Sequence, residues 1–399
     1  MRLTPRFLTL LAAIAFGSLS MFGNVTAQDK KDVKKGEEKK TEEKKVEEKK
    51  PEPFVPDKAQ AEFKGHGDWI NDVAFSGDGK TILSASRDRT AKTWDLLGKN
   101  LQTLKGHAEN VKAAAFVGDK IATSAGKWNK EKKAWEGEIK LWAGDKQSGS
   151  LKGHDQTIES IAVSKDGKTL VTGSEDQTIL VWDVAAGKPS QTLKGHTGAV
   201  LAVAVTPDGK KVASTSRDRS IKIWDVASAK DIATMKVEIE KKVEPKKEEP
   251  KKMDPKKVDP KKEEPKKVDP KKVDPKAAAP GKEPSREFVS LAFSPDGSKL
   301  AAGNLDGMVK IYDAADGKEI GELMGHEGVW ALAFSPDGSK LATGGWDQTI
   351  KVWDLASKKD VQTIKAHMGT VTALDFSPDG SLIASGGTDN LVKIWAVKK

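Results

Sequence analysis

The sequence predicts an all-β fold built from seven copies of a four-stranded unit. Two observations point to repetition: a Trp recurs about every 41 residues, and a Gly-His pair precedes most of these Trp residues. A third is that short apolar runs alternate with turn signals and no long helical pattern interrupts them. The repeat position is held by Trp94, Trp142, Trp182, Trp224, Trp353 and Trp395, and by Tyr312 in the remaining unit.

Each unit contains three short runs and a fourth that precedes Gly-His. In one unit the runs are residues 200–205, 212–216 and 220–226, all rich in Val, Ala, Ser, Thr or Ile, and residues 191–194 supply the fourth. Such runs between turn residues are typical of β-strands. Asp-Gly pairs begin at residues 78, 166, 208, 296, 337 and 379, where they predict tight hairpin turns.

The order Gly-His, Pro-Asp-Gly, Asp and Trp-Asp resembles the WD-repeat β-propeller family, in an exported, bacterial-type form. The resemblance covers nearly all of residues 59–399 outside an insert at 237–284. It implies a seven-bladed propeller whose motif straddles two blades. Residues 59–64 then form an outer strand with no blade before it, and the last blade ends after Trp395 without one. We expect these two parts to join and close the ring.

The resemblance also implies a buried network in which Asp accepts from His, His meets a strand Ser or Thr, and that hydroxyl meets the Trp indole. Its members are His66, Asp88 and Trp94; His154, Asp176 and Trp182; His196, Asp218 and Trp224; His326, Asp347 and Trp353; His367, Asp389 and Trp395. All six His residues of the chain belong to Gly-His or Ala-His positions, and there is no Cys. His and Cys are the usual catalytic and metal-binding residues, and here every His has a structural place in the repeat. We therefore expect no catalytic residue, metal or cofactor.

Two units depart from the pattern. Glu136 stands six residues before Trp142, where the other units have Asp, and residues 126–138 look like an inserted loop. The unit that ends at Tyr312 has Asp306 but no His. We therefore expect incomplete networks in both units.

Outside the repeats, three segments have their own composition. Residues 1–27 carry two Arg, an apolar run and Val-Thr-Ala, which predicts a secretory signal peptide; an uncleaved membrane anchor is the alternative. Residues 28–58 hold 11 Lys and 10 acids and predict a disordered tether. The insert at 237–284 repeats Lys-Lys-x-acid-Pro seven times, which predicts an unfolded extension of one loop.

The net charge of +9 comes mostly from these segments. Outside residues 1–58 and 236–284, 38 basic residues face 37 acidic ones. A nearly neutral body argues against a surface that follows a phosphate backbone, so we expect no nucleic-acid partner.

Five Trp residues lie outside the repeat position, and four Arg residues flank turn Asp residues. In the family geometry all of their loops open on one face of the propeller, the top face. Trp and Arg are enriched at interaction hot spots, so we predict a partner site there. Trp330 and Trp346, from one repeat, should lie close together; the alternative is that Trp69 and Trp330 only fill gaps between blades. The predicted site comprises Trp69, Trp128, Trp135, Trp330, Trp346, Arg87, Arg89, Arg217 and Arg219.

These observations favour a monomeric, non-catalytic scaffold that binds a protein or peptide in the periplasm or at the cell surface. One alternative is a propeller hydrolase or lyase that uses acids at the channel mouth, such as Asp68, Glu159 or Glu327. Another is adhesion of the Lys-rich segments to anionic envelope components. The pentads favour it weakly, because acids offset their Lys pairs.

Overall fold

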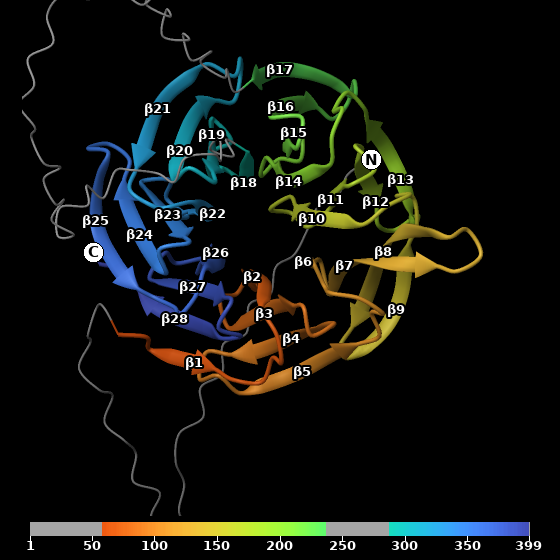
Figure 1. Cartoon of the computed structure of the whole chain (residues 1–399), viewed down its shortest axis with the longest axis horizontal. Coiled ribbons are helices and arrows are strands. Elements are labelled where there is room, and N and C mark those ends of the chain that lie inside the picture. The colour runs from red at the N-terminus through yellow and green to blue at the C-terminus, as the bar shows by residue number, and fades with distance from the viewer. Residues whose placement is uncertain (1–57, 237–286, 399) are drawn as a thin grey trace, which may run out of the picture. The chain divides into compact units, whose positions relative to one another are not determined.

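The structure is a computed structural model that describes residues 58–236 and 287–398. In these residues, 28 strands form seven four-stranded antiparallel sheets, and no helix occurs. Figure 1 shows the sheets arranged as blades around a central axis, which confirms the predicted seven-bladed propeller. The predicted signal peptide, the insert at 237–284 and all but the last residue of the tether lie outside the described residues.

The first four blades are described here from the inner strand outward. Blade 1 is β2 (Ile70–Phe75), β3 (Thr81–Ser86), β4 (Thr90–Asp95) and β5 (Asn100–Lys105). Blade 2 is β6 (Ala113–Val117), β7 (Lys120–Asn129), β8 (Ala134–Ala143) and β9 (Lys146–Leu151). Blade 3 is β10 (Ile158–Val163), β11 (Thr169–Ser174), β12 (Ile179–Asp183) and β13 (Lys188–Leu193). Blade 4 is β14 (Val200–Val205), β15 (Lys211–Ser216), β16 (Ser220–Asp225) and β17 (Lys230–Lys236).

The last three blades follow the same order. Blade 5 is β18 (Phe288–Phe293), β19 (Lys299–Asn304), β20 (Met308–Asp313) and β21 (Glu319–Met324). Blade 6 is β22 (Val329–Phe334), β23 (Lys340–Gly345), β24 (Thr349–Asp354) and β25 (Lys359–Lys365). Blade 7 is β26 (Val371–Phe376), β27 (Leu382–Gly387), β28 (Val392–Ala396) and β1 (Ala61–Phe63).

The turn between the first and second strands is set by Asp-Gly, as the sequence predicts. In blade 1 the Asp78 carboxylate accepts from the Lys80 N–H at 3.1 Å and from the Ser76 hydroxyl at 2.6 Å. Gly79 has φ +70°, a conformation that residues with a Cβ rarely adopt. The side chain and the glycine together fix a tight turn that returns the chain into the second strand.

The hydrophobic core lies between the blades rather than in one central mass. One cluster joins Val171 and Val181 of blade 3 to Val203, Val212 and Trp224 of blade 4. The second strand of a blade is covered on both sides, and five of the six residues of β15 are buried. Small Ala, Ser and Thr side chains in these strands let neighbouring blades approach closely.

The ring closes through its first strand, which confirms the prediction from the two ends of the repeat region. β1 pairs antiparallel with β28, with Ala61 opposite Ile394 and Phe63 opposite Val392. Figure 1 shows the two strands side by side although they lie at opposite ends of the colour scale. The Phe63 ring is 1% exposed and lies 5.6 Å from the Trp94 ring of blade 1. The strand therefore completes blade 7 and packs against blade 1.

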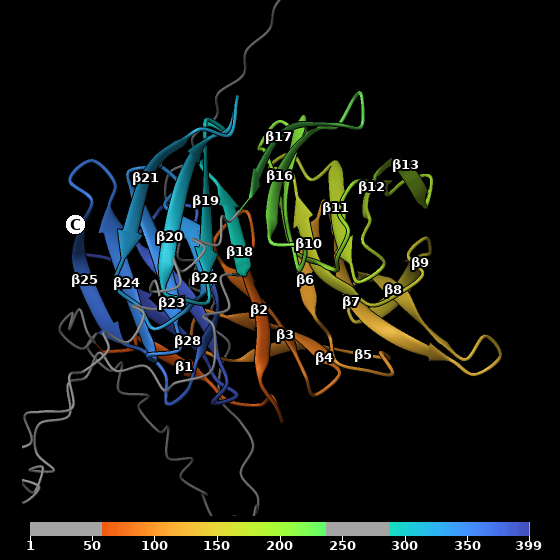
Figure 2. The ribbon, with the colours of Figure 1, turned by 45° about the horizontal axis from the view of Figure 1, so that its top comes forward.

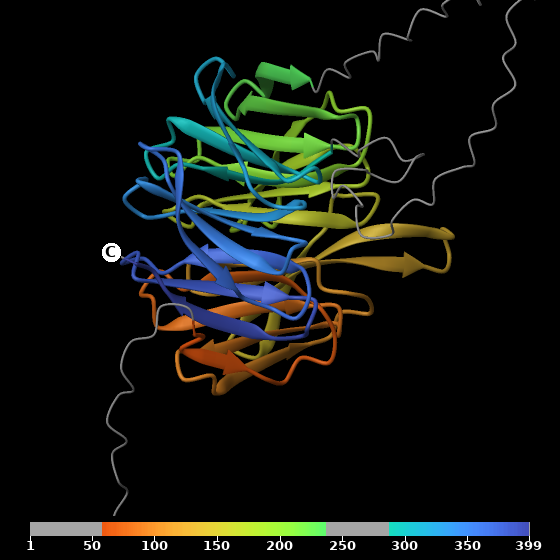
Figure 3. The ribbon, with the colours of Figure 1, turned by 60° about the vertical axis from the view of Figure 1, so that its left-hand side comes forward.

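The expected loop at residues 126–138 is a hairpin instead. β7 and β8 are ten-residue strands that stay paired as far as Asn129 opposite Ala134. Figures 2 and 3 show this hairpin projecting beyond the other blades. Cross-strand pairs such as Trp128 with Trp135 stabilise the extension, so the inserted residues lengthen the sheet. None of the described residues forms a helix long and apolar enough to cross a membrane.

Candidate functional site

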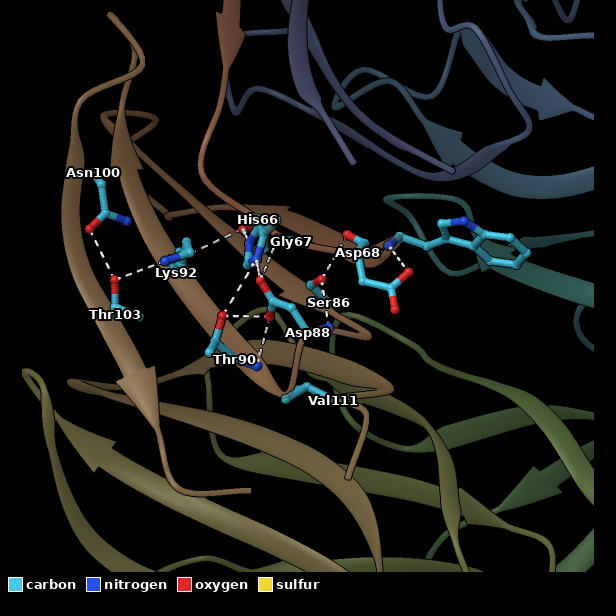
Figure 4. Close-up of polar contacts among 12 residues, drawn as sticks. His66, Gly67, Asp68, Ser86, Asp88, Thr90, Lys92, Asn100, Thr103 and Val111 are labelled. Atoms are coloured by element: carbon cyan, nitrogen blue, oxygen red, sulfur yellow. Dashed lines mark hydrogen bonds and ion pairs between the residues drawn. The ribbon is translucent and has the colours of Figure 1, made fainter. Parts of the chain in front are cut away.

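The His, Asp and Trp residues of the repeat form chains of buried hydrogen bonds. In blade 1, Trp94 Nε1 donates to Ser84 Oγ at 2.8 Å, Ser84 Oγ lies 2.7 Å from His66 Nε2, and His66 Nδ1 lies 2.7 Å from Asp88 Oδ2. Figure 4 shows the Asp88 end of this chain, where Thr90 also donates to the carboxylate. An indole N–H can only donate, so the Ser84 hydroxyl donates onward to Nε2 and the Nδ1–H of His66 points at Asp88.

The same chain recurs in four further blades with the expected residues. The sets are His154, Thr172, Trp182 and Asp176; His196, Ser214, Trp224 and Asp218; His326, Thr343, Trp353 and Asp347; His367, Ser385, Trp395 and Asp389. In each set the hydroxyl receives the indole N–H and contacts the imidazole. All donors and acceptors of the chain are used, which suits a structural role in the sheet.

Electrostatics favour a neutral imidazole in the chains of blades 4 and 6. Burial lowers the pKa of His196 and His326, and this outweighs the raising effect of the Asp partner on each. Burial alone would raise the pKa of Asp218, yet hydrogen bonds from Ser220, Thr197 and His196 lower it to about 2. In blade 4, Asp218 is therefore ionised and His196 uncharged near pH 7.

The prediction for blade 2 was wrong, because its network is complete. His107 Nδ1 lies 2.9 Å from Glu138 rather than bonding to Glu136, while Nε2 and the Trp142 indole both reach Thr123 Oγ1. Glu138 lies on β8, four residues before Trp142, and its longer side chain reaches the imidazole. Glu136 instead pairs with Lys132 at 2.8 Å.

Blade 5 has no His, as the sequence shows, and its turn is held differently. The Asn304 side-chain oxygen accepts from the N–H of Asp306 at 3.1 Å and of Met308 at 2.9 Å. The Asn304 amide thus stabilises the turn that the His and acid pair stabilises in the other blades.

A cavity of about 620 Å³ lies at the centre of the ring. Its wall comes from the inner strands of all seven blades and from the loops that carry Trp69, Arg87 and Trp346. Trp330 lines it from β22. The structure thus brings together four of the nine residues predicted for a partner site, and the face on which they open is called the top face below.

A repeated backbone hydrogen bond places these side chains in pairs. The N–H of the residue before the turn Asp donates to the carbonyl of the residue just before the inner strand. In blade 1 it joins Arg87 to Trp69 at 2.9 Å, and in blade 6 it joins Trp346 to Gly328 at 3.2 Å. In blade 1 the side chains of Arg87 and Trp69 therefore meet at the rim, whereas Gly328 of blade 6 has no side chain. The other bonds of this kind join Glu175 to Thr157, Arg217 to Ala199, Leu305 to Glu287 and Thr388 to Thr370.

Two aromatic contacts lie beside the cavity. The Arg87 guanidinium carbon lies 3.9 Å from the centre of the Trp69 ring, a cation–π distance. The Trp330 and Trp346 rings are 5.9 Å apart and tilted by 43°, so the predicted proximity of these two residues is present in the structure. Trp346 is 46% exposed beside the cavity, whereas Trp330 is partly buried.

The mouth of the cavity is polar on one side and apolar on the other. In six blades, the second residue of the inner strand faces the channel. In blade 2 the residue just before the inner strand, Lys112, takes this place. Lys112 and Glu159 hold an ion pair at 3.0 Å on the polar side. Leu201, Val289 and Trp330 occupy the matching positions of blades 4, 5 and 6. A ligand at the mouth therefore meets an apolar wall on blades 4–6.

The other five predicted residues do not line the cavity. Trp128 and Trp135 stack edge to face at 5.6 Å on the projecting hairpin and are 45% and 40% exposed. Arg89 and Arg219 follow the turn Asp with φ of 69° and 65°. Arg217 matches Arg87 in its turn, but its backbone partner is Ala199, which offers no ring for stacking.

Sequence reasoning missed several residues of the cavity wall. Thr370 and Thr388 form the rim pair of blade 7, and Asp72 lies on β2 with its carboxylate 3.0 Å from the Ala114 N–H. The rim pair could have been found from position alone, because each Thr stands where blade 1 has Trp69 or Arg87. Burial raises the pKa of Asp72 to about 7.

The three acids considered for catalysis lie in different surroundings. Glu159 lines the cavity but is engaged by Lys112, and Asp68 accepts from the Trp69 N–H at 2.7 Å. Glu327 is exposed and does not line the cavity. Within the described ranges no three His, Asp or Glu residues are grouped as a metal site would need.

Comparison with known proteins places the repeat in a family. A family model described as WD domain, G-beta repeat matches residues 57–95, 145–183, 187–225, 283–313, 317–354 and 358–396. Five of the six matched segments begin near the outer strand of one blade and end with the third strand of the next, as the straddling motif predicts, and the segment 283–313 begins shortly before β18. Blade 2 supplies most of the unmatched gap at residues 96–144, where the hairpin is lengthened and Glu138 replaces Asp.

Similar proteins are aligned over part of their length. The chain is 32% identical over 146 residues to "Nuclear distribution protein PAC1-2" of Uncinocarpus reesii, which is 31% of each chain. It is 32% identical over 123 residues to "Ribosome biogenesis protein WDR12 homolog" of Drosophila erecta and of Drosophila yakuba, 29% of this chain and 28% of those proteins. The chain thus spans less than a third of the length of these relatives. With the repeat matched over more than half of the chain, this protein belongs to the WD40 repeat family.

Proposed function

We propose that the protein is a non-catalytic scaffold that binds a protein or peptide through the top face of its propeller. The observation that carries the proposal is the central cavity, rimmed by Trp69 with Arg87 and by Trp330 with Trp346. Partly exposed Trp and Arg beside an apolar wall are the residues that anchor protein partners. The WD40 family fold supports an interaction role, and the His residues are engaged in the blade networks.

The finer points of the proposal rest on the sequence. The signal-peptide pattern of residues 1–27 supports export to the periplasm or the cell surface. The near balance of charge outside the Lys-rich segments supports a protein rather than a nucleic-acid partner, and those segments supply at most weak contact with anionic envelope components. Pairing with β1 covers the edge of β28 that blade 7 would otherwise expose, which supports a monomer.

The test is capture of partners from an envelope extract by the full chain and by Trp346→Ala. We expect Trp346→Ala to lose the captured protein, because truncation of a hot-spot aromatic costs on the order of 2 kcal/mol or more. Trp128→Ala removes an equally exposed Trp from the projecting hairpin and serves as the matched control. Equal capture by all three chains, with unchanged melting curves, would place the partner site away from the cavity.

A further inference from the structure

Four hydrogen-bond donors on one arc of the cavity lack a side-chain partner among the described residues. They are the guanidinium of Arg87 in blade 1, the hydroxyls of Thr370 and Thr388 in blade 7, and the indole N–H of Trp330 in blade 6. The Trp330 N–H is shielded from solvent and has no partner in the described structure, which is rare for a buried donor. Arg87 is exposed and the two Thr residues are partly exposed, so these three donors are open to an acceptor on a ligand.

The acids near this arc already accept hydrogen bonds or form ion pairs with other residues. Two acids line the cavity in the described part of the chain, Asp72 and Glu159. Glu159 is paired with Lys112 on blades 2 and 3, and Asp72 accepts from the Ala114 N–H. In blade 7, the turn carboxylate of Asp389 is held by His367 and the Met368 N–H. The positive charge of Arg87 therefore has no carboxylate partner from the described residues.

Arg87 is held in a defined orientation. Its backbone N–H donates to the Trp69 carbonyl at 2.9 Å, and its guanidinium lies 3.9 Å from the centre of the same residue's ring. Stacking uses the face of the guanidinium and leaves its N–H edge free. A preorganised guanidinium edge matches the two oxygens of a carboxylate, which can accept about four hydrogen bonds in total.

Apolar surface adjoins the donor arc. Trp346 is 46% exposed and contacts Trp330, while Leu201 and Val289 continue the wall on blades 4 and 5. The cavity of about 620 Å³ has room for more than one side chain, since ligand pockets of 300–1,000 Å³ hold drug-sized molecules. An anionic group at blades 7 and 1 would thus be followed by an apolar group at blades 4–6.

We propose that the cavity recognises an acidic peptide, and that Arg87 with the hydroxyls of Thr370 and Thr388 binds the carboxylate of an Asp or Glu residue. The neighbouring apolar side chain of the peptide packs on Trp346. The proposal rests on the proposed function, because it names the chemistry of the partner at the same cavity. A cationic segment is disfavoured, since it would meet unpaired donors and the Arg87 charge.

The probe is a phage-displayed library of random peptides selected against the full chain. Selected sequences should be enriched in Asp or Glu beside Leu, Ile, Phe or Trp. The best peptide is then synthesised with its acid and with the matching amide, and binding is titrated by the fluorescence of the protein. The amide peptide and the Arg87→Gln variant should each bind about tenfold or more weakly, as loss of a hydrogen bond to a charged group predicts.

Arg89→Gln is the matched control, because it removes the same charge from the same turn at a residue that does not line the cavity. It should keep most of the affinity. Equal losses for Arg87→Gln and Arg89→Gln would overturn the proposal and indicate long-range attraction only. Selected peptides without acids, or tighter binding of a phosphoserine than of a Glu peptide, would also overturn the carboxylate assignment.

The proposed function fails in a different way. If the selected peptides bind equally well to Trp346→Ala, and substitution of other cavity residues also leaves their affinity unchanged, the top-face site itself is wrong. If Trp346→Ala weakens binding while Arg87→Gln and the amide peptide do not, the site stands and only the carboxylate inference falls.

Discussion

Removal of one hydroxyl from blade 1 should destabilise the whole propeller. Ser84 is fully buried, receives the Trp94 N–H and contacts His66 Nε2. Ser84→Ala leaves a buried indole donor and a buried imidazole nitrogen without partners. Each unsatisfied buried group costs about 1–3 kcal/mol, so the expected loss in free energy of unfolding is roughly 2–6 kcal/mol.

Blade 2 offers a control with the same change of side chain. Ser124 on β7 is also fully buried, but its hydroxyl has no hydrogen-bond partner in the described structure. Ser124→Ala removes a desolvated hydroxyl that bonds to nothing, so stability should stay unchanged or rise slightly. The comparison holds the residue type, the second strand of a blade and the burial nearly constant; Ser124 lies one residue after Thr123, which is the blade 2 equivalent of Ser84.

The assay is equilibrium unfolding in guanidinium chloride followed by Trp fluorescence and circular dichroism. Coincident transitions and an unchanged slope would allow the two free energies to be compared directly. If Ser84→Ala lies within about 0.5 kcal/mol of the unchanged protein, or if Ser124→Ala costs as much, the network does not carry the stability assigned to it.

Three further predictions concern ring closure, pH and the insert. Phe63→Ala should cost about 3–5 kcal/mol, because the ring is buried against Trp94, while Glu62→Ala on the same strand should change little; equal melting temperatures for both would argue against closure by β1. Burial raises the pKa of Asp375 to about 7, so its neutral form favours folding below pH 4 and this stabilisation disappears as the pH rises through 7. Asp375→Asn should therefore raise the unfolding midpoint at pH 8 and leave it nearly unchanged at pH 4, and an equal shift at both values would refute the titration. Replacing residues 237–286 by a short Gly/Ser loop should preserve the melting temperature, because blades 4 and 5 are complete without them; broadened unfolding would show a misplaced strand.

The number of blades and the ring closure could be predicted because the signals for both lie within the repeated sequence. Each Asp-Gly turn and each buried strand is specified within one unit, and the leftover strand at 59–64 needs a partner for its edge groups. The acid of the blade 2 network was predicted wrongly because we looked for it six residues before Trp142, the spacing of the other units. Pairing of β7 and β8 continues past Glu138, so the acid lies on a strand and the count leads to Glu136 instead.

The candidate site was partly predictable. Trp330 and Trp346 could be paired from their positions in one repeat, and both line the cavity. Arg87 and Arg217 have the same local sequence context, yet only Arg87 has an aromatic partner across its backbone hydrogen bond. Which side chains meet at the rim depends on the residue before the inner strand, a spatial neighbour that the Arg pattern alone does not reveal.

Closure of the ring by β1 sets an order of events during synthesis. The hydroxyl of Thr372 donates to the carbonyl of Ile70, a contact across 302 residues of chain, and β1 waits for β28 in the same way. Until β28 is available, β1 has no partner and the side of blade 1 that faces blade 7 has no neighbour. Such long-range contacts form slowly, so these edges stay open to aggregation until blade 7 has formed.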